Sequence, residues 1–333
     1  MNMNMKETIL VIGAGSWGTA IAQTLAGYDH TVMIWDSNDA ILEEIHSKHT
    51  NSRYHPNLKL SENIEIATSL EDACLRSSAI VLSIPTSFIP HYLETIVEIA
   101  RPTPLIVNAS KGLNHKNLQT LSMFVKKSLG KMVYDRYAVL SGPSFAKEVA
   151  EGKPTALSLA CVNEDHLIRL AKAFHSNNFQ IFPTNDVLGV EIGGALKNVI
   201  AITVGASDGL GLGHNTRAAL MTKGQEEISS IGKALGAKES TFWGLSGIGD
   251  LMLTCTGDLS RNRRAGLKLA EGKSVKQILN ELGQIAEGIR TTKSAYLLAQ
   301  QLKVKAPIIE ETYNAIYGHK PISEAVESIL DNI

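Results

Sequence analysis

The feature that most limits the fold of this 333-residue chain is the order of its apolar segments. Up to about residue 185, short β-branched runs alternate with stretches of helical spacing. The runs are TILVI (8–12), TVMIW (31–35), IEIA (64–67), AIVLSI (79–84), PLIVNAS (104–110), YAVLS (137–141), TALSLAC (155–161) and FQIF (179–182). Near-continuous apolar runs are typical of strands that are buried on both faces, so this order predicts a parallel α/β sheet.

The remainder of the chain has helical spacing without a strand pattern. Its segments include VLGVEIGGALKNVIAITVGA, TRAALMTKGQEEISSIGKAL, SRNRRAGLKLAEG, SVKQILNELG and SEAVESILDNI. Pro183 and Thr184, followed by Asn185 and Asp186 as candidate N-caps, mark the junction. A chain of this length is expected to form two domains, and we predict them at residues 1–186 and 187–333, the second all-helical.

Charge and composition indicate a small-molecule partner. Lys and Arg (32) nearly balance Asp and Glu (33), so the chain lacks the net positive field that draws proteins to nucleic acid or acidic membranes. The composition, 44% hydrophobic and 20% charged, is that of a globular enzyme. We expect no run long enough to span a bilayer and no cleaved leader at the start of the chain, which predicts a cytoplasmic protein.

The three cysteines do not indicate a metal site or a disulfide framework. Cys74, Cys161 and Cys255 are odd in number and lack paired spacing. We therefore expect small buried apolar side chains, a reducing compartment and no bound metal.

The strand 8–12 runs directly into Gly13-Ala14-Gly15-Ser16-Trp17-Gly18 and then into a helix. In a GxGxxG loop, the first glycine makes the tight turn, the second admits a pyrophosphate and the third permits close helix packing. The helix N-terminus presents free N–H groups to the anion. This Rossmann-type pattern predicts dinucleotide binding.

Asp36 directly follows the second strand, where an acidic residue can bind the adenosine ribose hydroxyls. Alternatively, it only shapes a turn with Ser37 and Asn38. An acid at this position favours NAD over NADP, although Ser37, Asn38 or Arg53 could still accept a 2′-phosphate. We therefore expect NAD or NADP.

Ligands of doubly wound sheets bind beyond the carboxyl ends of the strands. Two such ends carry polar groups: Ser110-Lys111-Gly112, and the segment from Ser141 through Gly142, Pro143 and Ser144 to Ala146. Each could be an ordinary surface lysine or turn, but their shared edge favours a site.

The helix expected at 187–206 is apolar except for Glu191, Gly193, Gly194, Lys197 and Asn198. The two glycines lie on the face of Lys197, where their missing side chains would leave space for a flat ring or a small substrate. The competing interpretation is close helix packing beside a lysine that reaches solvent along its stem.

A candidate anion site follows the GIGD segment at 247–250. Ser260 is a good N-cap, which places Arg261 and Asn262 in the first turn of a helix, where the dipole favours a phosphate. Guanidinium groups bind phosphate as a fork, although three arginines at 261, 263 and 264 also suit a basic surface or a domain clamp.

Taken together, these segments resemble the NAD(P)-dependent glycerol-3-phosphate dehydrogenases over nearly the whole chain. The resemblance rests on GAGSWGTA (13–20), SKG (110–112), SGPSFA (141–146), EIGGALKNVIAI (191–202), GIGDL (247–251) and SRNRR (260–264). It implies a homodimer that interconverts sn-glycerol 3-phosphate and dihydroxyacetone phosphate, a phosphorylated triose, for phospholipid synthesis.

The resemblance also implies roles for single residues. Lys197 would be the catalytic acid and base, with Lys111 and Asp250 assisting. The substrate contacts would be Lys111, Gly142, Ser144, Lys197, Asn198, Asp250, Thr254, Ser260, Arg261 and Asn262. The cofactor contacts would be Gly13, Gly15, Ser16, Trp17, Gly18, Asp36, Ser37, Tyr54, Lys111, Ala146, Arg261, Ile285 and Glu287.

Lys197 must be neutral to accept the proton of the substrate hydroxyl. Burial and the charge of Lys111 would lower its pKa, and Asp250 would raise it. The alternatives are a related dehydrogenase of a hydroxy acid or ketopantoate, and a non-catalytic dinucleotide sensor, which would have no use for the two lysines and Asp250 together.

Overall fold

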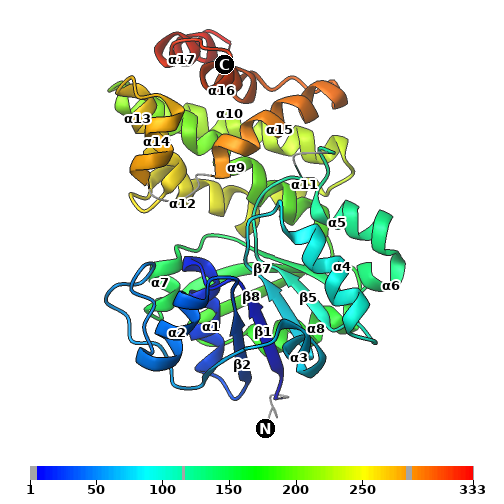
Figure 1. Cartoon of the computed structure of the whole chain (residues 1–333). Coiled ribbons are helices and arrows are strands. Elements are labelled where there is room, and N and C mark those ends of the chain that lie inside the picture. The colour runs from blue at the N-terminus through cyan, green and yellow to red at the C-terminus, as the bar shows by residue number, and fades with distance from the viewer. Residues whose placement is uncertain (1–5, 115–116, 283–286, 333) are drawn as a thin grey trace. The chain divides into compact units, whose positions relative to one another are not determined.

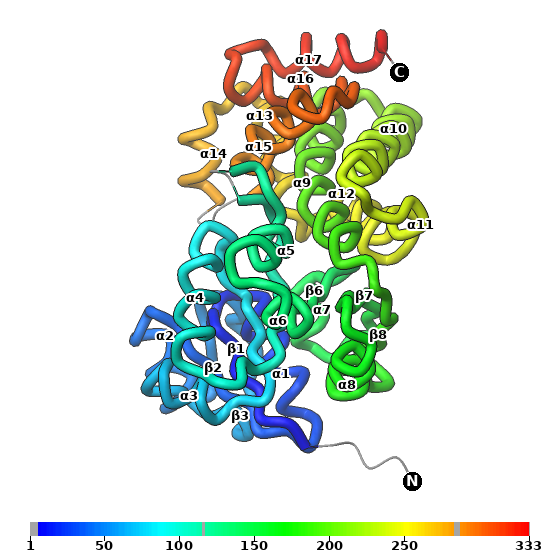
Figure 2. The backbone as a smooth tube through the Cα atoms, turned by 90° about the vertical axis from the view of Figure 1, so that its right-hand side faces the viewer, coloured from blue at the N-terminus to red at the C-terminus, as the bar shows by residue number. Residues whose placement is uncertain are grey.

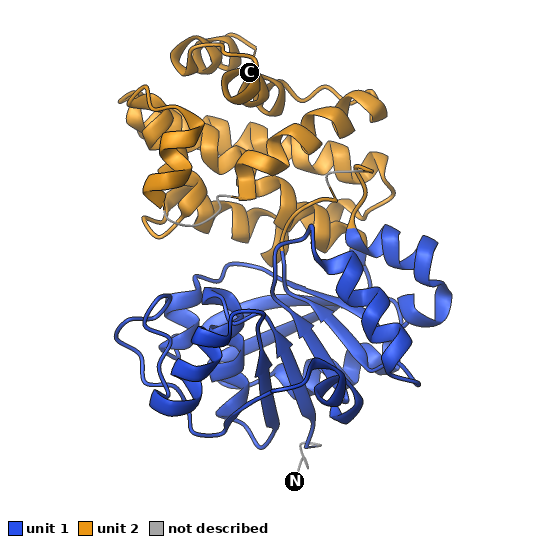
Figure 3. Cartoon of the chain, in the orientation of Figure 1, with its two compact units in different colours: residues 1–110, 121–187 blue, residues 111–120, 188–333 orange. Residues whose placement is uncertain are grey.

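The computed structural model describes residues 6–114, 117–282 and 287–332, and the chain forms two compact units (Figure 3). Unit 1 comprises residues 1–110 and 121–187, and unit 2 comprises residues 111–120 and 188–333. The segment 111–120 thus belongs by its contacts to the helical unit, although it follows a strand of unit 1. The sequence pattern did not indicate this crossing.

Unit 1 is built on an eight-stranded sheet (Figure 1). Its order is β3-β2-β1-β4-β5-β6-β7-β8, with β6 and β7 antiparallel and the other neighbouring pairs parallel. The strands are β1 Thr8–Ile12, β2 Thr31–Trp35, β3 Ile64–Ile66, β4 Ala79–Leu82, β5 Leu105–Asn108, β6 Tyr137–Ser141, β7 Thr155–Cys161 and β8 Phe179–Thr184. The predicted Rossmann-type α/β fold followed by a helical domain is confirmed.

The boundaries differ from the prediction at the last strand. β8 continues through Pro183 and Thr184, which pair with Leu159 and Ala160 of β7. The predicted end of this strand at residue 182 is therefore wrong, and Pro183 and Thr184 belong to β8. Proline lacks the N–H that an inner strand needs, but β8 is an edge strand and has only β7 to pair with.

Helices connect the strands of unit 1. They are α1 Ser16–Ala26, α2 Asp39–Lys48, α3 Leu70–Arg76, α4 Ile89–Ile99, α5 Leu121–Phe124, the π-turn Val125–Leu129, α6 Lys131–Tyr134, α7 Ala146–Ala150 and α8 Glu164–Phe174. α1 packs against α7, and α8 packs against β7 and β8. The central strands β4, β5 and β6 are buried at every residue, as their continuous apolar sequences predict.

The main elements of unit 2 are helices. They are α9 Val187–Gly209, α10 Gly213–Ala234, α11 Glu239–Phe242, the π-turn Leu245–Gly249, α12 Asp250–Thr256, α13 Arg261–Ala270, α14 Val275–Leu282, α15 Glu287–Leu302, α16 Pro307–Tyr317 and α17 Ile322–Leu330. α9 lies beside α10 (Figure 2), where Gly224 admits the side chain of Ile200. α9, α10, α12, α15 and α16 share one apolar core.

Contrary to the expectation from the sequence, one described helix is long and apolar enough to cross a membrane. This is α9, and 94% of its most apolar window is buried inside the protein. The expectation that no run is long enough to span a bilayer was wrong. Glu191, Lys197 and the glycines interrupt this apolar run, but its mean hydropathy is still high enough for a membrane-spanning helix. The burial is that of a core helix.

The cysteines are buried and free, as predicted. Burial raises the pKa of the Cys74 thiol to about 11 and raises the pKa of Cys255 as well. Both thiols therefore stay protonated at neutral pH and behave as small apolar side chains.

Candidate active site

The glycine loop between β1 and α1 contains a space suited to an anion. Gly13 has φ +108°, and a Cβ there would lie 2.4 Å from the carbonyl oxygen of Ser83. A Cβ at Gly18 would lie 1.8 Å from the carbonyl oxygen of Gly13. A Cβ at Gly15, in contrast, would meet no atom within 4 Å. Gly13 and Gly18 therefore serve the turn, and Gly15 faces open space at the N-terminus of α1, where a side chain would take the room of a pyrophosphate.

Asp36 holds the glycine loop and the next turn. One carboxylate oxygen accepts from Ala14 N at 2.7 Å, and the other accepts from Asn38 N at 2.9 Å. The turn-shaping role considered for Asp36 is thus present. Since each carboxylate oxygen can accept a second hydrogen bond, the ribose contact stays a prediction.

Two residues that the sequence pattern did not indicate hold the same loop from the segment after α2. The buried Asn51 amide donates to Ala14 O and to Thr19 Oγ1, both at 2.9 Å. His55 Nε2 lies 2.8 Å from Ser16 O. Asparagine and histidine in a loop carry no signal of this kind without the fold. Tyr54 lies between them, with the Arg53 guanidinium 5.5 Å from its ring centre.

The other cofactor and substrate candidates of unit 1 lie at strand ends. Trp17 Nε1 donates to Ala109 O at 3.1 Å, directly after β5. Gly142, after β6, has φ +150°, and Ser144 Oγ donates to its carbonyl at 3.0 Å. Ala146 begins α7, and Ser37 is exposed.

Unit 2 contains a carboxylate between two ammonium groups. Lys197 on α9 donates to one oxygen of Asp250 and, at 2.7 Å, to Thr254 Oγ1. Lys111 donates to the other oxygen of Asp250 at 2.6 Å. Thr254 in turn donates to the carbonyl of Asp250 at 2.7 Å, so its hydroxyl oxygen accepts from Lys197. The Asp250 side chain is 1% exposed and that of Lys197 is 7% exposed, whereas that of Lys111 is 20% exposed.

This environment brings Lys197 close to neutrality. Burial lowers the pKa of Lys197 to about 7, although Asp250 raises it, and the charge of Lys111 lowers it further. These opposing effects on the pKa of Lys197 are the ones expected from the sequence. In the structure, the loss of hydration lowers the pKa more than the attraction of Asp250 raises it. An amine with such a pKa can both accept and donate a proton near pH 7.

The local sequence explains how Asp250 reaches Lys197. A Cβ at Gly193, one turn before Lys197, would lie 2.5 Å from the carbonyl oxygen of Ser246. Gly247 has non-helical angles, and a Cβ there would lie 2.1 Å from Phe242 O. The two glycines allow the π-turn to press against α9 and to place Asp250 at the start of α12. The space predicted at Gly193 for a ligand is therefore filled by protein backbone, and the close-packing interpretation is correct there.

A polar helix N-terminus lies farther along unit 2. Ser260 caps α13 by accepting from Arg263 N at 3.2 Å, which leaves Arg261 and Asn262 in the first turn, as predicted. Asn262 donates to Asn198 Oδ1 at 2.8 Å and accepts from Gly288 N at 3.1 Å. This pair links the residue after Lys197 to α13 and α15. Glu287 begins α15, and Ile285 lies outside the described residues.

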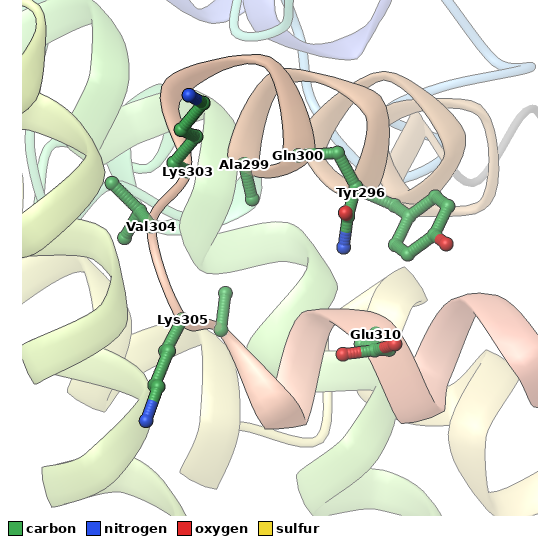
Figure 4. A pocket seen from close by; sticks show the side chains of 8 residues that line it. Tyr296, Ala299, Gln300, Lys303, Val304, Lys305 and Glu310 are labelled. Atoms are coloured by element: carbon green, nitrogen blue, oxygen red, sulfur yellow. The ribbon is translucent and has the colours of Figure 1, made fainter.

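A hollow of about 300 Å³ in unit 2 is lined by other residues (Figure 4). Gln300 and Tyr296 of α15 lie across from Glu310 of α16, and Lys303 and Lys305 flank the connection between the helices. None of the residues predicted to bind cofactor or substrate lines this hollow. We therefore assign it no part in the candidate site.

Comparison with known proteins assigns the family. The family model described as the NAD-dependent glycerol-3-phosphate dehydrogenase N-terminus matches residues 8–167, and that of its C-terminus matches residues 186–327. The chain belongs to this dehydrogenase family. A family member from Geobacter sp. (strain M21), named glycerol-3-phosphate dehydrogenase [NAD(P)+], is 44% identical over 98% of this chain and 97% of its own.

Solved structures agree with this membership. A glycerol-3-phosphate dehydrogenase from Coxiella burnetii has a TM-score of 0.92 and 35% identity, covering 98% of this chain and 99% of its own. A probable 2-dehydropantoate 2-reductase from Bacillus subtilis has a TM-score of 0.59 and 14% identity, covering 94% and 100%. The second match shows a shared fold alone, so the resemblance to the glycerol-3-phosphate dehydrogenase family is confirmed over the ketopantoate alternative.

Proposed function

We propose that this chain is an oxidoreductase that interconverts sn-glycerol 3-phosphate and dihydroxyacetone phosphate with NAD or NADP. The observation that carries the proposal is the buried Lys197 amine with a pKa of about 7, fixed by Asp250 and Thr254. Burying an ammonium or a carboxylate group costs on the order of several kcal/mol of desolvation free energy per ion. A dinucleotide sensor would have no use for an arrangement with this cost.

In this proposal, unit 1 carries the dinucleotide and unit 2 carries the proton-transferring group. The first-turn amides of α1, at Ser16, Trp17 and Gly18, would hold the pyrophosphate over Gly15. Asp36 and Ser37 would bind the adenosine side, with Tyr54 and Ala146 as further contacts. Bound nicotinamide supplies the hydride acceptor or donor. Lys111, Arg261, Ile285 and Glu287 complete the proposed contacts, and Asp36 disfavours a 2′-phosphate.

Lys197 would move the proton at the C2 oxygen. In oxidation, the neutral amine accepts the hydroxyl proton, and in reduction, the ammonium form donates it to the carbonyl oxygen. Lys111 adds positive charge where the alkoxide develops, and Asp250 keeps both lysines oriented. The triose phosphate would bind at Arg261 and Asn262, where the first-turn N–H groups and the guanidinium suit a dianion. The roles predicted for Gly142, Ser144, Asn198, Thr254 and Ser260 as further substrate contacts complete the set.

The test is reduction of dihydroxyacetone phosphate, assayed in parallel with NADH and NADPH. We expect K197A to lower kcat by about 10²- to 10⁴-fold, the usual contribution of a general acid or base, while cofactor still binds. Turnover of K197A near that of the parent protein would refute the assignment. A parallel panel of hydroxy acids and ketopantoate tests the alternative substrates, and cofactor binding without any turnover would favour the sensor.

We further propose a homodimer in the cytoplasm that supplies glycerol 3-phosphate for phospholipid synthesis. The family resemblance supports these assignments. Sedimentation equilibrium of the purified protein tests the dimer, and rescue of a glycerol-3-phosphate auxotroph tests the metabolic role.

A further inference from the structure

The helices α9 and α13 of unit 2 cross in direct backbone contact. A Cβ at Gly205 of α9 would lie 2.0 Å from the carbonyl oxygen of Arg263, and a Cβ at Gly266 of α13 would lie 2.0 Å from the carbonyl oxygen of Ile202. A Cβ at Gly209 would lie 2.6 Å from the Cβ of Ala270. Because each glycine accepts an atom of the facing helix, the start of α13 has a fixed distance from the helix that carries Lys197.

A buried carboxylate fixes the same crossing in the other direction. The side chain of Asp208, near the end of α9, is 6% exposed. One of its oxygens accepts from Arg217 Nε at 2.8 Å, and Arg217 Nη2 lies 2.8 Å from the same oxygen as an ion pair. The other accepts from Arg263 Nε at 2.8 Å. Arg263 Nη1 donates to Asp258 at 2.9 Å, but that carboxylate is 97% exposed and therefore adds little.

These contacts converge on the first turn of α13. Arg263 follows Asn262 directly, and its own N–H bonds to the Ser260 cap. α9 thus holds this turn at three points: the Asn198 side chain, the backbone at Gly205 and the Asp208 carboxylate. The arginine run noted in the sequence is divided accordingly, because Arg263 is bound internally while Arg261 is exposed.

We propose that Asp208 is a positioning residue for the proposed reaction, which sets the first turn of α13 through Arg263. The inference rests on the proposed function, in which Arg261 and Asn262 hold the substrate phosphate. Asp208 touches no reacting group. Its effect should therefore appear in the binding of phosphate-bearing molecules and not in proton transfer by Lys197, which lies eleven residues earlier on the same helix, about 16 Å along its axis.

The test compares D208N with R261A and with the control E311Q. E311Q breaks another, more exposed ion pair of unit 2, between Glu311 on α16 and Lys320, without touching α13. The assays are KM and kcat for dihydroxyacetone phosphate, the inhibition constant of inorganic phosphate, and kcat/KM for dihydroxyacetone. Since a misplacement of about 1 Å can cost about 100-fold, we expect D208N to raise KM and the phosphate inhibition constant by about 10- to 100-fold. Its kcat/KM for dihydroxyacetone should stay within about twofold of the parent value, and E311Q should change none of these quantities.

The outcomes separate the two proposals. If R261A lowers kcat/KM equally for dihydroxyacetone phosphate and for dihydroxyacetone, the phosphate site of the proposed function is wrong. If R261A lowers kcat/KM only for the phosphorylated substrate but D208N does not, Asp208 has only a structural role and the inference is overturned. The same holds if D208N lowers kcat/KM equally for both substrates. Should D208N fail to fold, R263K keeps the charge and loses the fork, and we expect a smaller phosphate-specific rise in KM. An R263K enzyme with unchanged KM would overturn the inference in the same way.

Discussion

The pKa of Lys197 can be moved in opposite directions by two substitutions at the same cluster. Asp250 bonds to both lysines, so D250N removes a negative charge that raises the pKa of Lys197. K111M removes the positive charge that lowers it and keeps an unbranched side chain of similar length. Burial, the largest cause of the shift, is nearly the same in both variants.

The magnitude follows from the contact distances. Lys111 and Lys197 bond to the two oxygens of one carboxylate, the first at 2.6 Å. At an effective dielectric constant of about 20, a unit charge about 4 Å away contributes about 4 kcal/mol, and about 1.4 kcal/mol corresponds to one pKa unit. After relaxation of the site, the measured range for such neighbours is about 1–3 units. We expect D250N to lower the pKa of Lys197 from about 7 by that amount, and K111M to raise it by about one unit.

The assay is the pH dependence of kcat/KM for glycerol 3-phosphate oxidation, which requires neutral Lys197. For the parent protein, activity should rise with pH through about 7, the pKa of the free enzyme, and the reduction should fall through the same range. The rising limb should move to lower pH in D250N and to higher pH in K111M. Both variants also lose rate, so the midpoints and not the plateaus are compared. A common direction in both variants, or midpoints equal to that of the parent protein, would refute the argument.

Three further substitutions test the glycine loop and a buried carboxylate. G15A places a Cβ in open space, so we expect a melting temperature within a few degrees of the parent protein and a cofactor dissociation constant raised by more than about tenfold. G18A should lower the melting temperature, because its Cβ would meet Gly13 O at 1.8 Å. Equal cofactor binding by G15A would contradict the dinucleotide role. The Glu227 carboxylate accepts from Ile308 N and Ile309 N, and burial raises its pKa to about 7. Folding therefore takes up a proton between about pH 4.5 and 7, so the free energy of unfolding should fall as pH rises through that window. In E227Q this fall should be absent from melting curves recorded at pH 5 and pH 7.5, and an unchanged pH dependence would show that other groups cause it.

The sheet was largely predictable from the sequence, because burial on both faces leaves a continuous apolar run in each strand. The runs at β1, β2, β6 and β7 match the observed bounds. The direction of β7 was not predictable. An antiparallel strand buried on both faces has the same apolar composition as a parallel one, and only its pairing Leu140↔Leu159 with β6 shows the reversal. Pro183 misled the prediction because proline ends inner strands but is accepted at a sheet edge.

The candidate site was predictable only in part, because its residues are far apart in the sequence. Helix caps are local, so Ser260 before Arg261 and Asn262 could be read directly. Lys111 and Asp250 are separated by 139 residues, and no local rule connects them. The family resemblance implied that both residues assist Lys197, but not that they bond to each other, and this pairing depends on the crossing of segment 111–120 into unit 2.

Asp208 shows a different limit of sequence reasoning. It lies in ASDGLGLG, where an aspartate before glycine is typical of a helix end or a turn, so the sequence does not single it out. Its role becomes visible only through its bonds to Arg217 and Arg263 in the structure. Arg263 belongs to the arginine run in which Arg261 is assigned to the substrate phosphate. A buried carboxylate with two guanidinium partners is costly to desolvate, and a pair of well-packed apolar residues could stabilise the crossing as well. The charged solution adds a directional restraint on Arg263, and such a restraint matters where the same turn must meet a ligand in one orientation.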